Sequence, residues 1–274
     1  MQQPPNLELE QQWQQPQEPP KKSRTGYVLG VLLAVTFVLC SGLVVLGEYA
    51  GNAQRQAYEN QKTKMIAAQN ASEKAEQEAQ QATTEAQAVP IPTNASLTLS
   101  GVGQQASHII RFQQGLAIFT FMHDGTANFI VHLTYTKSNI VYYLANAIGS
   151  FDGSKAEGIY YAGAYVLDIQ ADGKWTVTIQ QPGPTDAPYI TSFRGKGQAA
   201  TDLFSMKSGV KTINLTHDGT SIFNVRLLDS NGNDLGYVVI HTGTFHGSKT
   251  KDIPTDGIYI FDVQADGNWT INIQ

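Results

Sequence analysis

The chain contains an internal duplication, and this feature constrains its fold more than any other. Aligned with itself at an offset of 94 residues (Gln180 onto Gln274), the 274-residue sequence matches 101–180 to 195–274 without a gap, and 31 of the 80 pairs are identical. The segments "VLDIQADGKWTVTIQ" and "IFDVQADGNWTINIQ" illustrate the match. Two copies of this length indicate duplicated domains, because a solenoid needs a larger number of shorter units.

Each copy alternates apolar and polar residues with a period of two, which predicts half-buried antiparallel strands. In the first copy two predicted strands have inward-facing apolar residues, one starting with Tyr165 and the other with Trp175. Their counterparts in the second copy start with Tyr259 and Trp269. Turn residues recur about every ten positions, a spacing typical of a β-sandwich. The sequence therefore predicts an all-β tandem repeat of two antiparallel β-sandwich domains. The predicted domains are 95–181 and 190–274, joined by a linker at 182–189.

The repeated motif QADG is interpreted as the turn of a β-hairpin. A three-residue loop, Ala171-Asp172-Gly173, pairs Ile169 with Trp175 and places the apolar side chains on one face, with Gly173 in the left-handed region as a bulge. A calcium loop is the alternative, but one Asp per turn supplies no converging set of oxygen ligands, so we predict no metal site. The residues assigned to structural turns and core are Asp172, Gly173, Trp175, Asp266, Gly267 and Trp269.

A second motif, HDGT, occurs at His123–Thr126 and His217–Thr220. Its Asp-Gly pair also predicts a hairpin turn, and we expect His123 and His217 at the exposed edges of these turns. No histidine recurs beside them in both copies to complete a catalytic or metal site.

An apolar run of 21 residues without a charge extends over Tyr27–Gly47. As a helix it would span about 31 Å, close to the thickness of a bilayer core. It exceeds the apolar region of a secretory signal, about 7–15 residues, although cleavage after Ala53 is the alternative. Lys21, Lys22 and Arg24 precede the run, which predicts a cytoplasmic N-terminus and a single-pass anchor in the cell membrane, with the later domains extracellular.

The segments around this run differ in composition. Residues 1–26 are rich in Gln and Pro and predict a disordered cytoplasmic tail. Residues 48–88 contain Ala, Gln, Glu and Lys without proline and predict a helical stalk, followed by a linker at 89–94. The stalk is interpreted as a spacer; weak homo-oligomerisation through its alanine-rich heptad seam is the alternative.

Composition excludes several classes of site. The single cysteine, Cys40, rules out an intrachain disulfide and a cysteine-based metal site. The net charge of −5, without a basic stripe, argues against a nucleic-acid partner. Asp168 and Asp262 are expected in mid-strand on the solvent face without a partner, and no catalytic motif or cofactor site is evident.

The segments "LLDSNG" (227–232) and "DGIYIFDV" (256–263), with the closing Trp strand, resemble extracytoplasmic bacterial β-sandwich modules, namely prepeptidase C-terminal-like and carbohydrate-binding-like ones. This resemblance implies binding of glycans or proteins, or an accessory role, without catalysis. The sequence thus favours a non-catalytic, membrane-anchored cell-surface binding or adhesion protein whose partner is a surface glycan or protein. A structural or sensory membrane protein without a small-molecule ligand is the alternative, and a cell-wall hydrolase comes third.

Tyrosines at which the copies differ suggest where a ligand would bind. Tyr142, Tyr160 and Tyr161 occupy positions where the second copy has Gly236, Pro254 and Thr255. By alternation we expect Tyr143 to point inward and Tyr142 outward, so that these three tyrosines form an exposed platform. The alternative is that they pack on the linker or on the second repeat.

Overall fold

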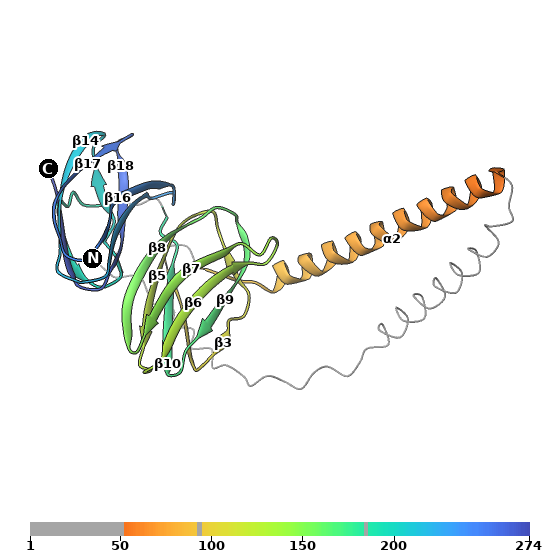
Figure 1. Ribbon diagram of the computed structural model, residues 1–274, viewed down its shortest axis with the longest axis horizontal. Helices are drawn as coiled ribbons and strands as arrows, with labels where there is room; N and C mark the ends of the chain where they lie inside the picture. Colours follow the sequence, from red (N-terminus) through yellow and green to blue (C-terminus); the bar gives the residue numbers. More distant parts are fainter. Residues whose placement is uncertain (1–51, 92–94, 184–185) are drawn as a thin grey trace. The chain divides into compact units, whose positions relative to one another are not determined.

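The computed structural model describes residues 52–91, 95–183 and 186–274 (Figure 1). The predicted tail and the apolar run at 27–47 lie outside the described residues. Among the residues that are described, no helix is long and apolar enough to cross a membrane. The chain divides into two compact units, one containing the described helix as far as Thr83 and the other extending from Thr84 to Gln274.

The helix α2 spans Asn52–Gln87, which confirms the helical prediction for these residues. Its composition explains it, since Ala, Gln, Glu and Lys are strong helix formers. From residue 55 to residue 83 only Tyr58 and Met65 are half-buried, and the other side chains are exposed. The described part of the chain therefore offers this helix almost no packing partner.

The first repeat consists of two sheets that enclose a common core. Its strands are β2 (Ser96–Val102), β3 (Gln105–Ala106), β4 (Ile110–Phe112), β5 (Gly115–His123), β6 (Asn128–Tyr135), β7 (Val141–Ile148), β8 (Phe151–Ile159), β9 (Gly163–Gln170) and β10 (Lys174–Gln180). One sheet has the order β2-β10-β5-β8 and the other β4-β9-β6-β7, with β3 also paired to β9. All of these pairs are antiparallel.

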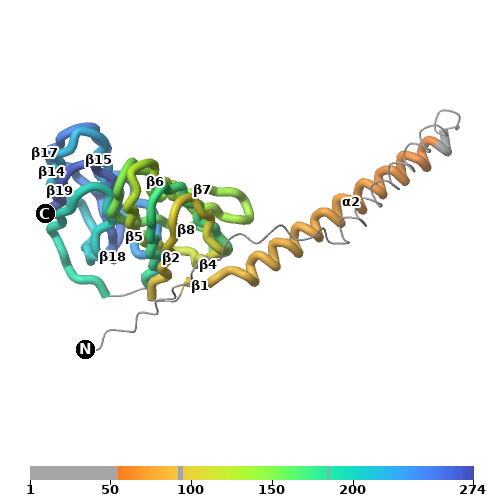
Figure 2. The backbone as a smooth tube through the Cα atoms, turned by 90° about the horizontal axis from the view of Figure 1, so that it is seen from below, coloured from red at the N-terminus to blue at the C-terminus, as the bar shows by residue number. Residues whose placement is uncertain are grey.

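The second repeat has the same topology, strand for strand. Its strands are β11 (Ser192–Lys196), β12 (Ala199–Ala200), β13 (Phe204–Met206), β14 (Gly209–His217), β15 (Ile222–Asp229), β16 (Asp234–Thr242), β17 (Phe245–Ile253), β18 (Gly257–Ala265) and β19 (Asn268–Ile273). The sheets have the orders β11-β19-β14-β17 and β12-β18-β15-β16, with β13 paired to β18. Figure 2 shows β14, β17 and β19 grouped at the C-terminal end of the chain. The predicted all-β duplication is confirmed.

The alternating pattern correctly identifies the core. Trp175 and Trp269 are 2% and 3% exposed, and Tyr165 and Tyr259 are fully enclosed by other apolar side chains. Each Trp donates its indole N–H to a backbone carbonyl, of Gly103 in the first repeat (2.9 Å) and of Gly197 in the second (3.0 Å). The polar atom of each buried indole is thereby satisfied, as burial requires.

The predicted hairpins at QADG and HDGT are wrong. β9 and β10, on either side of Ala171-Asp172-Gly173, belong to opposite sheets, as do β5 and β6 on either side of HDGT. Both motifs therefore connect one sheet to the other. The apolar faces of β9 and β10 still meet, but across the core instead of side by side. Alternation alone could not distinguish these arrangements, because both bury the same side chains.

A β-bulge sets the orientation of the tyrosines on β7. Val131 pairs with Ala145 and His132 with Tyr143, so Leu144 is an extra residue on this edge strand. The bulge reverses the inward and outward alternation before it, which explains why Tyr142 is buried and Tyr143 exposed, the reverse of the prediction. The second repeat has the same shift, between Val225 and Arg226.

The segment after the helix is not a simple linker. β1 (Val89–Pro90) adds a parallel strand to β4, with the Val89 amide donating to the Ile109 carbonyl. Glu85, in the last helical turn, forms ion pairs with Arg111 (2.6 Å) and Lys137 (3.1 Å). These contacts attach residues 85–91 to the first sandwich.

Candidate functional site

The HDGT and QADG turns of the first repeat interlock at one end of the sandwich. Asp172 accepts hydrogen bonds from the backbone N–H groups of Thr126 and Ala127, both at 2.9 Å, and Asp124 accepts one from the N–H of Lys174 at 2.6 Å. Backbone donation from Thr126 is the main cause that holds the pKa of Asp172 below its ordinary value. Each aspartate therefore fixes the other turn.

The second repeat reproduces this pair of interlocked turns. Asp266 accepts from the N–H groups of Thr220 (2.9 Å) and Ser221 (3.0 Å), and Asp218 accepts from the N–H of Asn268 (2.6 Å). The structural interpretation of Asp172, Gly173, Asp266 and Gly267 is consistent with these contacts. Among the described residues, no group of three or more potential metal ligands occurs.

The glycines of these turns allow the two loops to touch. A Cβ atom on Gly173 would lie 2.5 Å from the backbone nitrogen of Gly125, and one on Gly125 would lie 2.0 Å from a carboxylate oxygen of Asp172. Neither glycine has a positive φ, so the predicted left-handed bulge at Gly173 is wrong. Close approach, rather than backbone conformation, requires glycine here.

The histidines of HDGT are buried, not exposed as predicted. His123 and His217 are 5% and 3% exposed, and their rings stack on Phe129 and Phe223 with centroids 4.7 Å apart in both repeats. In each repeat Nδ1 bonds to a backbone carbonyl at 2.9 Å, that of Gly149 or Gly243. Nε2 faces Asp172 at 3.3 Å in the first repeat and Asp266 at 3.2 Å in the second.

These turns and aromatic residues border a hollow at the same end of each sandwich. In the second repeat the hollow has a volume of about 380 Å³ and is lined by Thr216, His217, Asp218, Thr244, Phe245, His246, Asn268, Trp269 and Thr270. Nine residues at the corresponding positions of the first repeat line a larger cleft of about 1000 Å³. The duplication has thus kept the position of the hollow as well as the fold.

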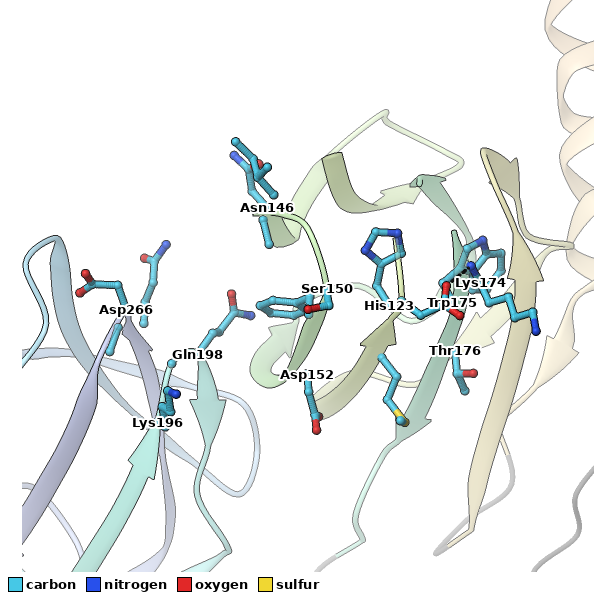
Figure 3. A pocket seen from close by; sticks show the side chains of 18 residues that line it. His123, Asn146, Ser150, Asp152, Lys174, Trp175, Thr176, Lys196, Gln198 and Asp266 are labelled. Carbon is cyan, nitrogen blue, oxygen red and sulfur yellow. Dashed lines mark hydrogen bonds between the residues drawn. The ribbon is translucent and has the colours of Figure 1, made fainter. Parts of the chain in front are cut away.

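The cleft of the first repeat is larger because the second repeat forms its other wall. Lys196 and Gln198 of the second repeat lie on one side of the open space, and Ser150 and Asp152 of the first repeat lie on the other (Figure 3). The lining also includes Met122, Asn146, Ile148 and Gln264. Carboxylates, ammonium groups and amides therefore surround the space together with exposed apolar side chains, a mixture that can hydrogen-bond a polar ligand while packing on its apolar surface.

A buried ionic network, here called the inter-repeat network, holds the two walls together. Its members are Lys155 and Glu157 of the first repeat and Arg226 and Asp262 of the second. Lys155 Nζ lies 3.0 Å from Asp262 Oδ2, and Arg226 Nη2 lies 3.3 Å from the same oxygen and 3.1 Å from Glu157 Oε2. Burial lowers the pKa of Arg226, but Asp262 and Glu157 outweigh it and raise the pKa above its usual value. Each repeat therefore contributes one basic and one acidic side chain to the network.

Apolar residues and glycines complete this contact. Leu116 and Ala156 of the first repeat form one buried cluster with Leu228 and Ile260 of the second. A Cβ atom on Gly158 would lie 2.0 Å from the carbonyl oxygen of Gly232, so only glycine fits there.

The inter-repeat network was missed by sequence reasoning, which placed Asp262 on a solvent face without a partner. Two signals were available in the sequence. Lys155 and Asp262 are charged residues identical in both copies, at Lys249 and Asp168. Their pairing could not be inferred, because it depends on how the two domains meet.

The predicted tyrosine platform does not form as expected. Tyr142 is 8% exposed and burial raises its pKa, whereas Tyr143 is 72% exposed and packs edge-on against His132. Tyr160 and Tyr161 are exposed in the loop between β8 and β9, as predicted. Tyr161 stacks on Tyr135 of its own repeat at 5.7 Å. None of the predicted three lines the cleft.

Comparisons with known proteins leave the family open. No protein-family model matches the chain, and no curated protein matches it. Among solved structures, the PBSX exported protein XepA aligns at 7% identity and a TM-score of 0.24, over 68% of this chain and 89% of that one. Oxalate decarboxylase of Bacillus subtilis aligns at 7% identity and a TM-score of 0.15, over 68% and 78%. The stem and receptor binding domain of a spike protein from bacteriophage PM2 aligns at 6% identity and a TM-score of 0.14, over 66% of this chain and 79% of that one. Such low TM-scores carry no argument, and the resemblance to prepeptidase and carbohydrate-binding modules stays a prediction.

Proposed function

We propose that this chain is a membrane-anchored binding protein that presents two β-sandwich modules outside the cell and takes up its ligand in the cleft between them. One observation carries the proposal: the two repeats jointly build an open cleft of about 1000 Å³ lined by Asp152, Lys174, Lys196 and Gln264. Asp152, Lys174, Lys196 and Gln264 are exposed, so their hydrogen-bonding groups face solvent and can contact a ligand.

The chemistry of the lining favours a neutral or mixed-charge polar ligand, such as a surface glycan or a polar protein segment. Asp152 provides an acceptor, and Lys174 and Lys196 provide donors, while the carboxylates of Asp124 and Asp266, which bind the turns, balance the charge of the lysines. Ile148 and Met122 add exposed apolar contact area. Recognition in such clefts depends on a few placed polar groups over an apolar surface.

The membrane anchor is proposed from the apolar run at 27–47 and the lysines and arginine that precede it. Its test is protease treatment of intact cells that carry one tag at the N-terminus and another at the C-terminus. We expect loss of the C-terminal tag and survival of the N-terminal one. A mature chain that begins near Gln54 would instead show that the run is a cleaved signal.

Ligand binding is tested with the full chain in detergent against a panel of soluble oligosaccharides and against whole cells. The variant Asp152→Ala/Lys174→Ala/Gln264→Ala removes three exposed side chains from both walls of the cleft. The duplication supplies a matched control, His246→Ala/Asn268→Ala/Gln170→Ala, which changes the corresponding positions outside the cleft. We expect binding to fall at least tenfold in the first variant and to persist in the control.

Two outcomes would favour other functions. Binding lost equally in both variants would show that the cleft is not the site. Absence of binding to every glycan and cell type, together with a signalling defect when the N-terminal tail is deleted, would favour the structural or sensory alternative.

A further inference from the structure

The contact between the two repeats contains a hydrogen-bonded strip as well as the apolar cluster. The edge strand β8 meets the start of the second repeat, where the Ser154 N–H donates to the Gln198 carbonyl (3.2 Å) and the Ala200 N–H donates to Ser154 Oγ (2.9 Å). Gln198 Nε2 donates to the Leu144 carbonyl at 2.8 Å. Asp262 accepts from Lys155 Nζ and from the Ala156 N–H, both at 3.0 Å.

Only four side chains take part in these five hydrogen bonds, and the remaining partners are backbone groups. The four are Ser154 and Lys155 on the first repeat and Gln198 and Asp262 on the second. At the offset of 94 residues their counterparts are Ser248, Lys249, Gln104 and Asp168, and all four are identical in type. Each repeat therefore carries both halves of the strip, the Ser-Lys half and the Gln-Asp half. Within the chain only the Ser-Lys half of the first repeat contacts the Gln-Asp half of the second.

The unused halves are accessible. β17, which carries Ser248 and Lys249, is the outer strand of its sheet, and both residues are exposed. Gln104 is exposed and Asp168 is half-buried, and neither side chain forms a hydrogen bond or ion pair within the described residues. Ser248 Oγ bonds to Asn214, and Lys249 Nζ lies 5.8 Å from the centre of the Phe245 ring.

The core does not require these residues. A side chain exposed to solvent is free to change after duplication, and only 31 of the 80 aligned pairs are identical. The cleft lining shows the same retention: Gly197, Gln198, Gln264, Ala265 and Asp266 of the second repeat are matched by Gly103, Gln104, Gln170, Ala171 and Asp172. The fold explains why Gly103 and Asp172 are retained, because Gly103 accepts the Trp175 indole N–H and Asp172 fixes a turn. It does not explain why Gln104, Gln170 and Asp168 are retained.

We propose that β17 of one chain docks on the strip formed by Gln104, Ala106 and Asp168 in a second copy of this chain, and that Lys249 pairs with Asp168. The contact repeats only the hydrogen-bonded strip of the one within the chain, because Asp252 and Ser138 occupy the positions at which Gly158 and Gly232 approach closely. It joins the second repeat of one copy to the first repeat of the next. Such a head-to-tail interface is heterologous. In a dimer it leaves the Gln104–Asp168 strip of one chain and the β17 edge of the other unoccupied, so further copies can add. The interface also covers the hollow at His217 with the counterparts of the residues that cover His123, except that Val102 replaces Lys196.

This interface is weaker than its template within the chain. Arg226 and Glu157 are replaced by His132 and Lys251, which cannot form the same ion pair, and the buried Leu116 is replaced by the exposed Val210. The hydrogen-bonded strip remains, whereas the apolar cluster and half of the inter-repeat network do not. We therefore expect reversible association that depends on concentration and is promoted when chains are held together on a membrane.

Cysteine cross-linking tests the geometry. In the full chain with Cys40→Ser, one preparation carries Ser248→Cys and another carries Ala106→Cys. Under mild oxidation we expect a disulfide dimer in the mixture and none in either preparation alone, because the two positions meet only between copies. Intrachain cross-linking of Ser154→Cys/Ala200→Cys calibrates the reaction. Dimers in a single preparation, or none in the mixture when the calibration succeeds, would overturn the proposal.

Charge exchange tests the energetics by sedimentation of the full chain in detergent. Lys249→Asp and Asp168→Lys should each weaken association at least tenfold, and the double variant should recover it, because the pair is restored in reversed orientation. Lys62→Glu, on the exposed helix, is the control for net charge and should leave association unchanged. Association that persists in both single variants but is lost in Lys62→Glu would overturn the proposal in favour of the helix.

Discussion

Asp172 and Thr126 lie 46 residues apart in the sequence, yet the carboxylate of Asp172 accepts both the backbone N–H (2.9 Å) and the hydroxyl (3.1 Å) of Thr126. Asp266 and Thr220 repeat this relationship in the second sandwich. Each pair connects two turns that pass between the sheets. The turns at this end of each sandwich therefore act as one structural unit and fix the border of the cleft.

The first prediction concerns acid pH. The pKa of Asp172 is lowered chiefly by the Thr126 N–H, and that of Asp256 is lowered to about 2 by Lys207 and Ser208. In the unfolded chain the value is about 3.9. Since the folded pKa is the lower one, ionised aspartate stabilises the fold above about pH 4, and this contribution is lost as pH falls toward the folded pKa. We expect the melting temperature to fall between about pH 5 and pH 3.

Substitution identifies the aspartates responsible. Asp172→Asn/Asp266→Asn keeps the size of the side chains but removes their charge, so it should lower the melting temperature at neutral pH and flatten its acid dependence. Asp186→Asn, at an exposed position in the linker, is the control. An unchanged acid profile in the double variant would contradict the assignment.

The second prediction tests why glycine is needed at QADG. Gly173→Ala should destabilise the first repeat by about 1–3 kcal/mol, the usual range for an overpacked site, because the new Cβ would meet the backbone of Gly125. Gly257→Ala is the matched control, since its Cβ would meet Tyr259 at an ordinary contact distance of 3.4 Å. Chemical denaturation of both variants measures the difference. Equal losses would indicate that backbone entropy, not close approach, determines the cost.

The third prediction separates two adjacent tyrosines. Tyr142→Ala should cost about 3 kcal/mol or more, as for other large buried aromatics, whereas Tyr143→Ala should change the free energy of unfolding by less than about 0.5 kcal/mol. Thermal unfolding of the two variants suffices as the measurement. The opposite order would show that Leu144 does not form the bulge and that simple alternation holds along β7.

The residues themselves explain how far the sequence could predict this structure. Alternation identified Trp175, Tyr165 and their counterparts as core, because burial of apolar side chains depends on local periodicity. It failed at Tyr142, since one extra residue in a strand reverses every orientation beyond it. It also failed at His123, because the ring nitrogen of this buried histidine is hydrogen-bonded to the carbonyl of Gly149, which is distant in the sequence.

The cleft itself could not be predicted. It requires the second repeat to meet the first, and that meeting depends on Arg226, Glu157 and the Gly158–Gly232 approach, which no pattern within one copy reveals. Comparison of the copies could have indicated it. Charged residues kept at equivalent positions, such as Lys155 and Lys249, need a reason other than the core.

The fourth prediction concerns the inter-repeat network. Arg226→Met removes the only arginine in contact with both Glu157 and Asp262 among the described residues, and it leaves these carboxylates buried with Lys155 alone. Breaking a buried ion pair typically costs about 3–5 kcal/mol, mostly from the charge left without a partner. We expect calorimetry to show lower stability and a separate transition for each repeat. Arg194→Met, at an exposed position on β11, should leave the profile unchanged.

A double-mutant cycle makes this test specific. If Arg226 and Glu157 interact as their 3.1 Å separation indicates, Glu157→Gln should cost much less in the Arg226→Met background than in the original chain. The coupling free energy expected for groups in direct contact is about 0.5–3 kcal/mol. Losses that simply add would mean that Arg226 stabilises its own repeat rather than the contact. The walls of the cleft would then be held by the apolar cluster and the hydrogen bonds of Ser154, and the cleft variants would have to be interpreted with that contact alone.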